Sequence, residues 1–494
     1  MESQQTKKRQ LKSFKLFISQ NRPPVYKLTN IHNKFILKNM SKEKSDKNNL
    51  FSKIPQLEKL LSEEVLQETI QQIGRPHVLK IADNYLKTLR NNILAGEDVP
   101  AIFVCAEKVK NLCLPIIRKK ITPVINATGI ILHTNLGRSP LPEDIWDKAK
   151  QTAESYSSIE LDLSTGNRGK RFEFLNESMC LLTGAEAAVV LNNNAAAVFL
   201  MLKALAEGRE VIVARGQQVQ IGGGFRIPEI LEMAGCRLIE VGTTNITTLN
   251  DIKKAINENT AMVLWVHTSN YKIRGFTEQP DIKEIKKILP DNIILAVDQG
   301  SGNLSLNISE EPSVSSILKD GADLVCFSGD KILGGPQAGW VTGKTDYVKR
   351  ISSNQLMRTY RVGRAVASLM QEVLIYYLNQ GASPAQKALN LDAGKLKKRA
   401  ELMASKIIDG TAEVVEKNFS LGGGSTPDTG FSSWAIKINS KKNPEKIKTD
   451  LRNMSIPVIG FIENGAFYIH PASISEKDDT YVIDCLNKCL KNFD

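Results

Sequence analysis

The chain has 494 residues, of which 42% are hydrophobic and 24% are charged, a balance typical of a water-soluble protein with two or three domains. No apolar run approaches the roughly 18 residues that a membrane-spanning helix needs, so we expect no membrane partner. The net charge of +12 comes mostly from residues 1–48, with twelve Lys or Arg and three Asp or Glu, so charge alone does not predict a nucleic-acid-binding body.

Two segments precede the main body of the chain. Residues 1–48 are rich in Lys and Asn and lack sustained periodicity, which predicts a disordered basic extension. Residues 49–118 form the second segment, a helical domain. It has apolar residues at helical spacing from Val78 to Ile93, Gly96 as a stop, and one or two earlier helices within 54–73 that end at Gly74. Such a domain serves either packing and oligomerisation or substrate docking, and the spacing does not separate these roles.

The main body alternates short β-rich runs with amphipathic helices, which predicts an α/β domain over residues 119–375 with a mostly parallel sheet. The predicted strands are 187–192, 210–215, 237–242, 261–267, 293–298 and 323–328. A long helix through 371–378 leads into a smaller α+β domain, residues 376–494. This domain is expected to hold a helix over 382–408 and strands around 433–438 and 466–470.

The seven cysteines form no C-x-x-C pair, and several lie in apolar runs. This pattern predicts reduced, buried thiols and a cytoplasmic location. Cys485 and Cys489 are one helical turn apart, but no His or further Cys nearby completes a ligand set. We therefore expect no metal site.

Polar clusters follow three of the predicted strands, where ligands gather in open α/β sheets. Asn192, Asn193 and Asn194 precede an Ala-rich helix, whose free N–H groups suit a phosphate, although the same pattern also serves as a plain helix cap. Asp298 precedes a Gly-rich turn and could hold a pyridine nitrogen protonated, although it could equally cap the turn.

The third cluster, FSGDKILGGPQAGW (327–340), places Lys331 after an apolar strand and among glycines. A desolvated lysine has a lowered pKa and becomes an amine nucleophile suited to Schiff-base chemistry. Ser328 could donate to a cofactor phosphate. A phosphate cradle, then Asp298, then Lys331 is the order expected of a pyridoxal 5′-phosphate (PLP) enzyme, so the sequence predicts PLP bound covalently at Lys331.

The chain resembles bacterial selenocysteine synthases, the L-seryl-tRNA(Sec) selenium transferases, over about nine-tenths of its length. The resemblance is carried by INATGIILHTNLGR (125–138), YSSIELDLSTGNRGKR (156–171), LTGAEAAVVLNNNAAAV (182–198), IGGGFRIPE (221–229), VHTSNYKIRGFTE (266–278), SGDKILGGPQAG (328–339), LGGGSTP (421–427) and IPVIGFIENG (456–465). It implies a PLP-dependent transferase of fold type I, aspartate-aminotransferase-like, with a helical N-terminal domain that docks tRNA.

The resemblance also implies the reaction and its residues. Seryl-tRNA(Sec) would become selenocysteyl-tRNA(Sec) through a PLP-bound dehydroalanyl-tRNA, with selenophosphate as the selenium donor. Lys331 and Asp298 would be catalytic, and His267 would join the cofactor-binding residues. Arg138, Arg358 and Arg361 would bind the donor, since guanidinium groups suit oxyanions. A homo-oligomer, in the family a ring of dimers, would let one copy's docking domain serve a neighbour's site.

Several positions depart from the family pattern and put the substrate side in question. They are Gln217, Gln220, Ile246, Gln299, Gly363, Arg364 and Phe461. One alternative is therefore a PLP-dependent lyase or transferase that acts on a small amino acid or amino sugar, although such a substrate needs no docking domain. Another is a non-enzymatic tRNA-binding relative, which an intact Lys331 and Asp298 disfavour.

Overall fold

The computed structural model describes residues 51–491 except residues 96, 222–223, 269–270, 309–310, 409 and 423–424. The predicted basic extension, residues 1–48, and the predicted stop at Gly96 lie outside this part. The chain divides into two compact units, Met1–Thr122 and Pro123–Asp494, and each is described by itself.

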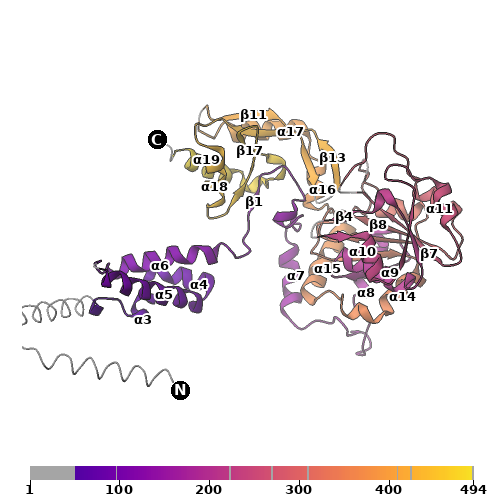
Figure 1. The fold of residues 1–494 in the computed structure, drawn as a ribbon, viewed down its shortest axis with the longest axis horizontal. Helices are drawn as coiled ribbons and strands as arrows, with labels where there is room; N and C mark the ends of the chain where they lie inside the picture. Colours follow the sequence, from indigo (N-terminus) through magenta and orange to yellow (C-terminus); the bar gives the residue numbers. More distant parts are fainter. Residues whose placement is uncertain are drawn as a thin grey trace, which may run out of the picture. The chain divides into compact units, whose positions relative to one another are not determined.

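The first unit is a helical bundle with its own apolar core (Figure 1). Its helices are α3 (Leu57–Leu61), α4 (Glu64–Ile73), α5 (Arg75–Leu94) and α6 (Ile102–Ile117). Val78, Ala82, Leu86 and Ile93 are buried along one face of α5, as their spacing predicts. Gly74 separates α4 from α5 because its φ of +82° is a conformation that favours glycine.

The second unit is built on a seven-stranded sheet (Figure 1). In spatial order its strands are β2 (Ala187–Leu191), β10 (Gly339–Gly343), β9 (Leu324–Ser328), β8 (Ile294–Gly300), β7 (Thr260–Val266), β3 (Glu210–Ala214) and β6 (Arg237–Val241). All six predicted strands are confirmed. The sequence missed β10, which is antiparallel to both of its neighbours.

Helices cover both faces of this sheet, so the strands are apolar on both sides. Ile212, Leu295 and Val297 face a core formed with one set of helices, and Val211 and Ala296 face the other. The first set is α7 (Ile145–Glu154), α8 (Glu173–Thr183), α11 (Leu249–Ala255), α12 (Ile282–Ile288), α13 (Val314–Lys319) and α15 (Arg364–Leu378). The second set is α9 (Asn194–Ala206), α10 (Ile227–Met233) and α14 (Thr345–Ser353).

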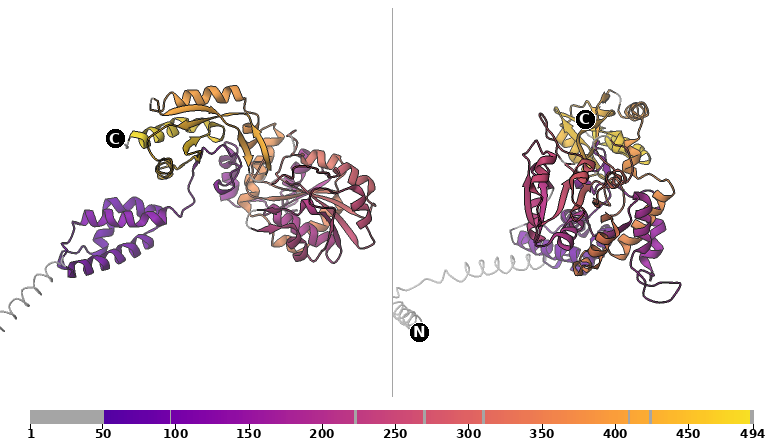
Figure 2. Two further views of the ribbon diagram at one scale, coloured as in Figure 1. Left: turned by 45° about the horizontal axis from the view of Figure 1, so that its top comes forward. Right: turned by 90° about the vertical axis from the view of Figure 1, so that its right-hand side faces the viewer.

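A smaller α+β part follows, with an antiparallel sheet in the order β11-β14-β17-β16 (Figure 2). Its elements are α16 (Pro384–Leu389), α17 (Ala393–Ala404), β11 (Ala412–Glu416), β12 (Phe419–Gly422), β13 (Ser425–Phe431), β14 (Trp434–Ile438), α18 (Pro444–Arg452), β15 (Val458–Ile459), β16 (Phe461–Glu463), β17 (Ala466–Ile469) and α19 (Asp479–Lys491). β1 (Ile125–Asn126) pairs with β15, so the start of the second unit packs with this small domain.

The prediction of one helix over 382–408 is wrong, because the segment forms two helices, α16 and α17. Asn390 ends α16, and the Asp392 side chain accepts a hydrogen bond from the backbone N–H of Lys395 to begin α17. This N-cap favours the start of a new helix at Ala393 over continuation of α16, although the apolar periodicity runs on.

All seven cysteines are free thiols, and all but the half-buried Cys180 are buried, as the sequence predicts. Across the described residues, no helix combines the length and apolar character that a membrane crossing requires.

Candidate active site

Lys331 lies in the turn after β9 and is only 7% exposed. It lines a cavity of ≈ 190 Å³ at the carboxyl edge of the parallel strands. Burial lowers the pKa of the Lys331 amine, and Arg138 lowers it further, while Asp298, Asp330 and Glu311 act in the opposite direction. A buried amine that loses its proton readily is a competent nucleophile.

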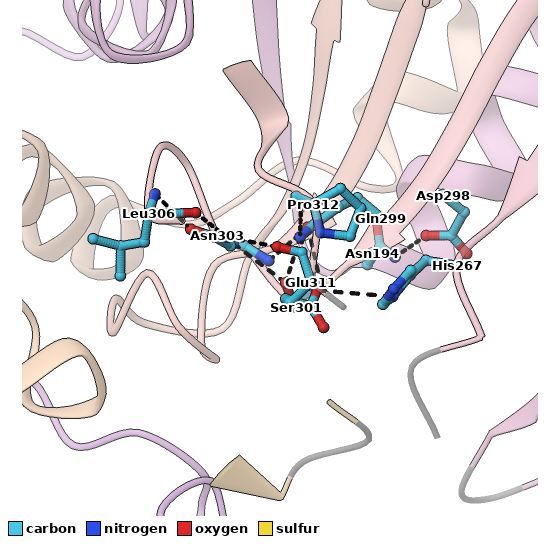
Figure 3. A network of polar contacts seen from close by, with 10 residues as sticks. Asn194, His267, Asp298, Gln299, Ser301, Asn303, Leu306, Glu311 and Pro312 are labelled. Carbon is cyan, nitrogen blue, oxygen red and sulfur yellow. Dashed lines mark hydrogen bonds and ion pairs between the residues drawn. The ribbon is translucent and has the colours of Figure 1, made fainter. Parts of the chain in front are cut away.

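Asp298 lies in β8, lines the same cavity and is 4% exposed. Burial raises the pKa of its carboxyl, whereas a hydrogen bond from Asn194 and the charges of Lys331 and His267 lower it. Asn194 Nδ2 donates to Asp298 Oδ1 at 2.8 Å, and the backbone N–H of His267 donates to the Asp298 carbonyl at 3.0 Å (Figure 3). The bond from Asn194 therefore orients the carboxyl, and the bond from His267 joins the backbones of the two strand ends.

The three asparagines of the predicted phosphate-binding segment, the cradle Asn192–Asn194, have different positions and roles in the structure. Asn193 caps α9, because its side chain accepts a hydrogen bond from the backbone N–H of Ala196. Asn193 and Asn194 line the cavity, so the positive end of α9 opens onto it. Asn192 is not among the lining residues described, and its backbone N–H donates to the carbonyl of Tyr360 at 2.9 Å.

The close approach of β10 to this cradle explains one glycine of the motif around Lys331. Gly339 pairs with Leu191 in β2 and with Ser328 in β9, so it lies between the cradle and the end of β9. A Cβ atom at Gly339 would overlap the backbone of Asn193. Ser328 lines the cavity beside Lys331, as the sequence predicts.

Arg138 reaches the cavity from the segment before α7. Its Nη1 lies 2.7 Å from Asp330 Oδ2, and its φ of +65° is unusual for a residue with a side chain. Backbone strain of this kind is concentrated at functional sites. Sequence reasoning missed Asp330, although it stands next to Lys331 in the motif and lines the cavity.

Arg358 and Arg361, the other predicted donor-binding residues, are not among the residues described as lining the Lys331 cavity. Arg361 lies 3.4 Å from Glu160, which also pairs with Arg171. Burial, Arg361 and Arg358 all lower the pKa of Arg171. Within one chain, Arg171, Arg358 and Arg361 therefore form a cationic cluster apart from the Lys331 cavity, which we call the second cationic cluster. Sequence reasoning missed Arg171 and Glu160.

His267 follows β7 and lines the cavity, where the sequence places it with the cofactor. Its ring stacks on Trp265, with centroids 5.9 Å apart, and its Nδ1 lies 3.7 Å from Glu311 Oε1 (Figure 3). Glu311 in turn accepts a hydrogen bond from Gln299 Nε2 at 3.1 Å. No motif in the sequence indicated Glu311.

The pocket has the groups that PLP requires. Among the described residues, the buried side-chain atoms without a hydrogen-bond partner in the protein include Asn194 Oδ1 and Asp330 Oδ1, both from residues that line the cavity. Buried polar atoms are normally satisfied, so these two indicate a polar occupant. An amine, a carboxyl, a helix N-terminus and a serine around one cavity suit a phosphorylated pyridine aldehyde.

Two departures from the family pattern are buried glutamines. Gln217 is 2% exposed and accepts a hydrogen bond from the backbone N–H of Val266 at 3.1 Å. A glutamate offers the same acceptor, so this replacement removes a charge and keeps the contact. Gln299 is fully buried and belongs to the network around Glu311.

The other departures lie nearer the surface. Gln220 accepts a hydrogen bond from an arginine of the paired strand β5 (Phe225–Arg226). Arg364 donates to a backbone carbonyl just after α7, and Phe461 stacks on an aromatic ring of β17. Nothing in the structure explains Ile246 or Gly363.

Comparison with known sequences gives one consistent result. The model of the L-seryl-tRNA selenium transferase family matches residues 124–475. The chain is 39% identical over 460 residues to the L-seryl-tRNA(Sec) selenium transferase of Carboxydothermus hydrogenoformans, covering 89% of this chain and 98% of the relative. It is 36% identical to the enzyme of the same name from Alkaliphilus oremlandii, covering 90% of this chain and 100% of the relative.

Among solved structures, the fold is similar to that of a D-glucosaminate-6-phosphate ammonia-lyase. The TM-score is 0.56, the identity is 20%, and the match covers 77% of this chain and 98% of that structure. The predicted fold class, an α/β fold-type-I large domain with a smaller α+β domain, is confirmed.

Proposed function

The chain belongs to the L-seryl-tRNA(Sec) selenium transferase family, and from this premise we propose that it converts seryl-tRNA(Sec) to selenocysteyl-tRNA(Sec). The cofactor is PLP, and the selenium donor is selenophosphate. The observation that carries the proposal is a buried lysine of lowered pKa next to a buried aspartate in one cavity. The seven-stranded sheet brings these two groups together from separate strand ends.

Different residues of the cavity would hold different parts of the cofactor. Lys331 would bind it covalently, and Asp298 would pair with the pyridine nitrogen. The capped N-terminus of α9 at Asn193 and the hydroxyl of Ser328 would receive the phosphate. PLP supplies an electron sink that stabilises negative charge on the Cα atom of the seryl group.

Lys331 would also move protons during the reaction. Its Nζ would remove the proton from the seryl Cα, since burial favours the neutral amine. The same atom would then give a proton to the hydroxyl group that leaves Cβ, which departs as water. Arg138 and Asp330 form an ion pair, and the two have opposite effects on Lys331, since Arg138 lowers the pKa of its amine and Asp330 raises it.

The donor is proposed to bind through arginines. Arg138 lies at the Lys331 cavity, while Arg358 and Arg361 lie with Arg171 in the second cationic cluster. Each guanidinium group can donate two parallel hydrogen bonds to a phosphate oxyanion, so a cluster of them suits such a donor. A second copy of the chain would bring the two sets together if this cluster faces the partner's cavity.

Exposed apolar side chains support a homo-oligomer. They lie in consecutive segments of the second unit, namely α7, the loop 155–171, which projects from the unit (Figure 2), and α8. The residues are Trp146, Tyr156, Leu161, Leu163, Phe174 and Leu181, which are 47–104% exposed. Apolar surface of this extent typically belongs to an interface.

The function is tested by incubating the purified protein, reconstituted with PLP, with seryl-tRNA(Sec) and selenophosphate. We expect selenocysteyl-tRNA(Sec) as the product, measured by mass spectrometry of the released amino acid. Seryl-tRNA(Ser) is the matched control and should remain unchanged. Equal conversion of both tRNAs, or of free serine alone, would favour the alternative small-substrate enzyme.

Removing residues 1–122 should abolish binding of seryl-tRNA(Sec) and leave the visible PLP absorption unchanged. The first unit has its own core, and every residue described at the cavity belongs to the second unit. The proposal assigns tRNA docking to the first unit. Gel shift measures the binding, with the full-length chain as control. A truncated chain that shifts tRNA as the full chain does would locate docking within residues 123–494.

A further inference from the structure

A buried acid that the proposed chemistry does not use lies beside the PLP cavity. Glu311 is 1% exposed and comes from the segment between β8 and α13, outside the motifs around Lys331 and Asp298 (Figure 3). Burial raises the pKa of its carboxyl. The charge of His267, a hydrogen bond from Ser301 and the charge of Lys331 each lower it. An acid is rarely buried this fully without a specific partner.

Gln299 fixes this acid in place. Its Nε2 donates to Glu311 Oε1 at 3.1 Å and to the Pro312 carbonyl at 3.2 Å, and its Oε1 accepts from the backbone N–H of Gly302 at 2.9 Å. Its Nε2 also donates to the hydroxyl of Ser301. One fully buried side chain therefore ties the acid-bearing segment to the end of β8, one residue from Asp298.

The acid also lies near a second residue of the cavity lining, His267. His267 Nδ1 lies 3.7 Å from Glu311 Oε1, and the side chain of His267 is 10% exposed while that of Glu311 is fully buried. The backbone N–H of His267 is held by Asp298, and its ring packs on Trp265. The backbone hydrogen bond and the stacking limit where the ring lies, and the carboxyl lies on the Nδ1 side of the ring at ion-pair distance.

We propose that Glu311, anchored by Gln299, is a positioning residue that directs Nδ1 of His267 away from the cavity and so presents the rest of the imidazole to the cofactor. Gln299 is one of the positions at which the chain departs from the family pattern. The inference rests on the proposed function, because it requires PLP to be the occupant of the cavity.

The Glu311 carboxylate also acts on Lys331 through space. It raises the pKa of the Lys331 amine, so removing its charge disfavours a proton on that nitrogen. In the PLP-bound protein, the pH midpoint of the visible absorption band should therefore move to lower pH when Glu311 becomes neutral. A purely structural role for Glu311 would change the melting temperature and leave this midpoint in place.

The test uses the full chain with Glu311→Gln, which keeps the shape of the side chain, and with Gln299→Leu, which removes the anchor. The first measurement is deuterium exchange at the imidazole C2–H of His267 in the apoprotein, by mass spectrometry. The second is PLP affinity by absorbance titration. We expect faster His267 exchange and PLP binding that is weaker by about 10–100-fold, the size of the loss when a group that orients a metal-binding histidine is removed.

Glu258→Gln is the matched control, because this exposed acid precedes the start of β7, the opposite end of the strand from His267. It should behave as the wild type in every measurement. Unchanged His267 exchange and PLP affinity in Glu311→Gln, with or without a lower melting temperature, would overturn the inference. A wild type that fails to bind PLP would instead overturn the proposed function. If Gln299→Leu does not fold, Glu311→Gln decides alone.

Discussion

Replacing Lys331 with alanine should give a folded, colourless protein with no measurable selenium transfer. The substitution removes the covalent attachment of PLP and the base that takes the Cα proton. General acid–base catalysis alone contributes about 10²–10⁴-fold, so the loss should be at least of this size. Activity is measured with seryl-tRNA(Sec) and selenophosphate, and the cofactor is measured by its visible absorption after reconstitution.

Lys349→Ala is the control for this substitution, because Lys349 is an exposed lysine of α14. It should keep both colour and activity. Borohydride reduction of the wild type followed by peptide mapping should place the cofactor on Lys331. A label on another lysine, or a Lys331→Ala protein that is still coloured and active, would contradict the assignment of the cofactor.

The sequence predicted the parts of the fold that depend on local pattern. Apart from β6 at the edge, the parallel strands are largely apolar runs because helices cover both faces of the sheet. β10 was missed because Gly339–Gly343 begins and ends with glycine and pairs on both sides, with β2, which is far from it in the sequence, and with β9, across the glycine-rich turn at Lys331. Its pairing depends on tertiary contacts that no local pattern records.

The candidate site likewise contains residues that the sequence predicted and residues that it could not predict. Asp298 and Ser328 lie near the carboxyl ends of β8 and β9, and Lys331 follows β9, so the sheet brings the three to one cavity. Glu311 comes from an irregular segment, and its burial depends on Gln299, so no spacing rule could place it. The separation of Arg361 from the cavity also depends on the path of the chain around Glu160.

The buried Asp298 carboxylate lowers the stability of the folded apoprotein, although the site requires this charge for function. Burial raises the pKa of Asp298 above the ordinary aspartate value of about 3.9, so the folded apoprotein binds its proton more tightly than the unfolded chain. Stability therefore falls as the pH rises from that value through the folded pKa. Active sites commonly trade stability for function in this manner.

Asp298→Asn should therefore stabilise the apoprotein and impair the enzyme. Asparagine keeps an oxygen that can accept from Asn194 Nδ2 and carries no charge to desolvate, so the melting temperature of the apoprotein should exceed that of the wild type at neutral pH and converge with it in acid. The lost carboxylate no longer holds a proton on the pyridine nitrogen. Since an electrostatic stabiliser of a transition state is typically worth about 10²–10³ in kcat, selenium transfer should fall by this factor.

Calorimetry of the apoproteins across pH and the selenium-transfer assay measure the two effects separately. Asp320→Asn, an exposed aspartate that ends α13, is the control and should change neither quantity. An Asp298→Asn enzyme with wild-type kcat would remove Asp298 from the chemistry. A variant whose apoprotein is less stable at neutral pH than the wild type would show that the carboxylate contributes more by its contacts with Asn194 and Lys331 than burial costs it.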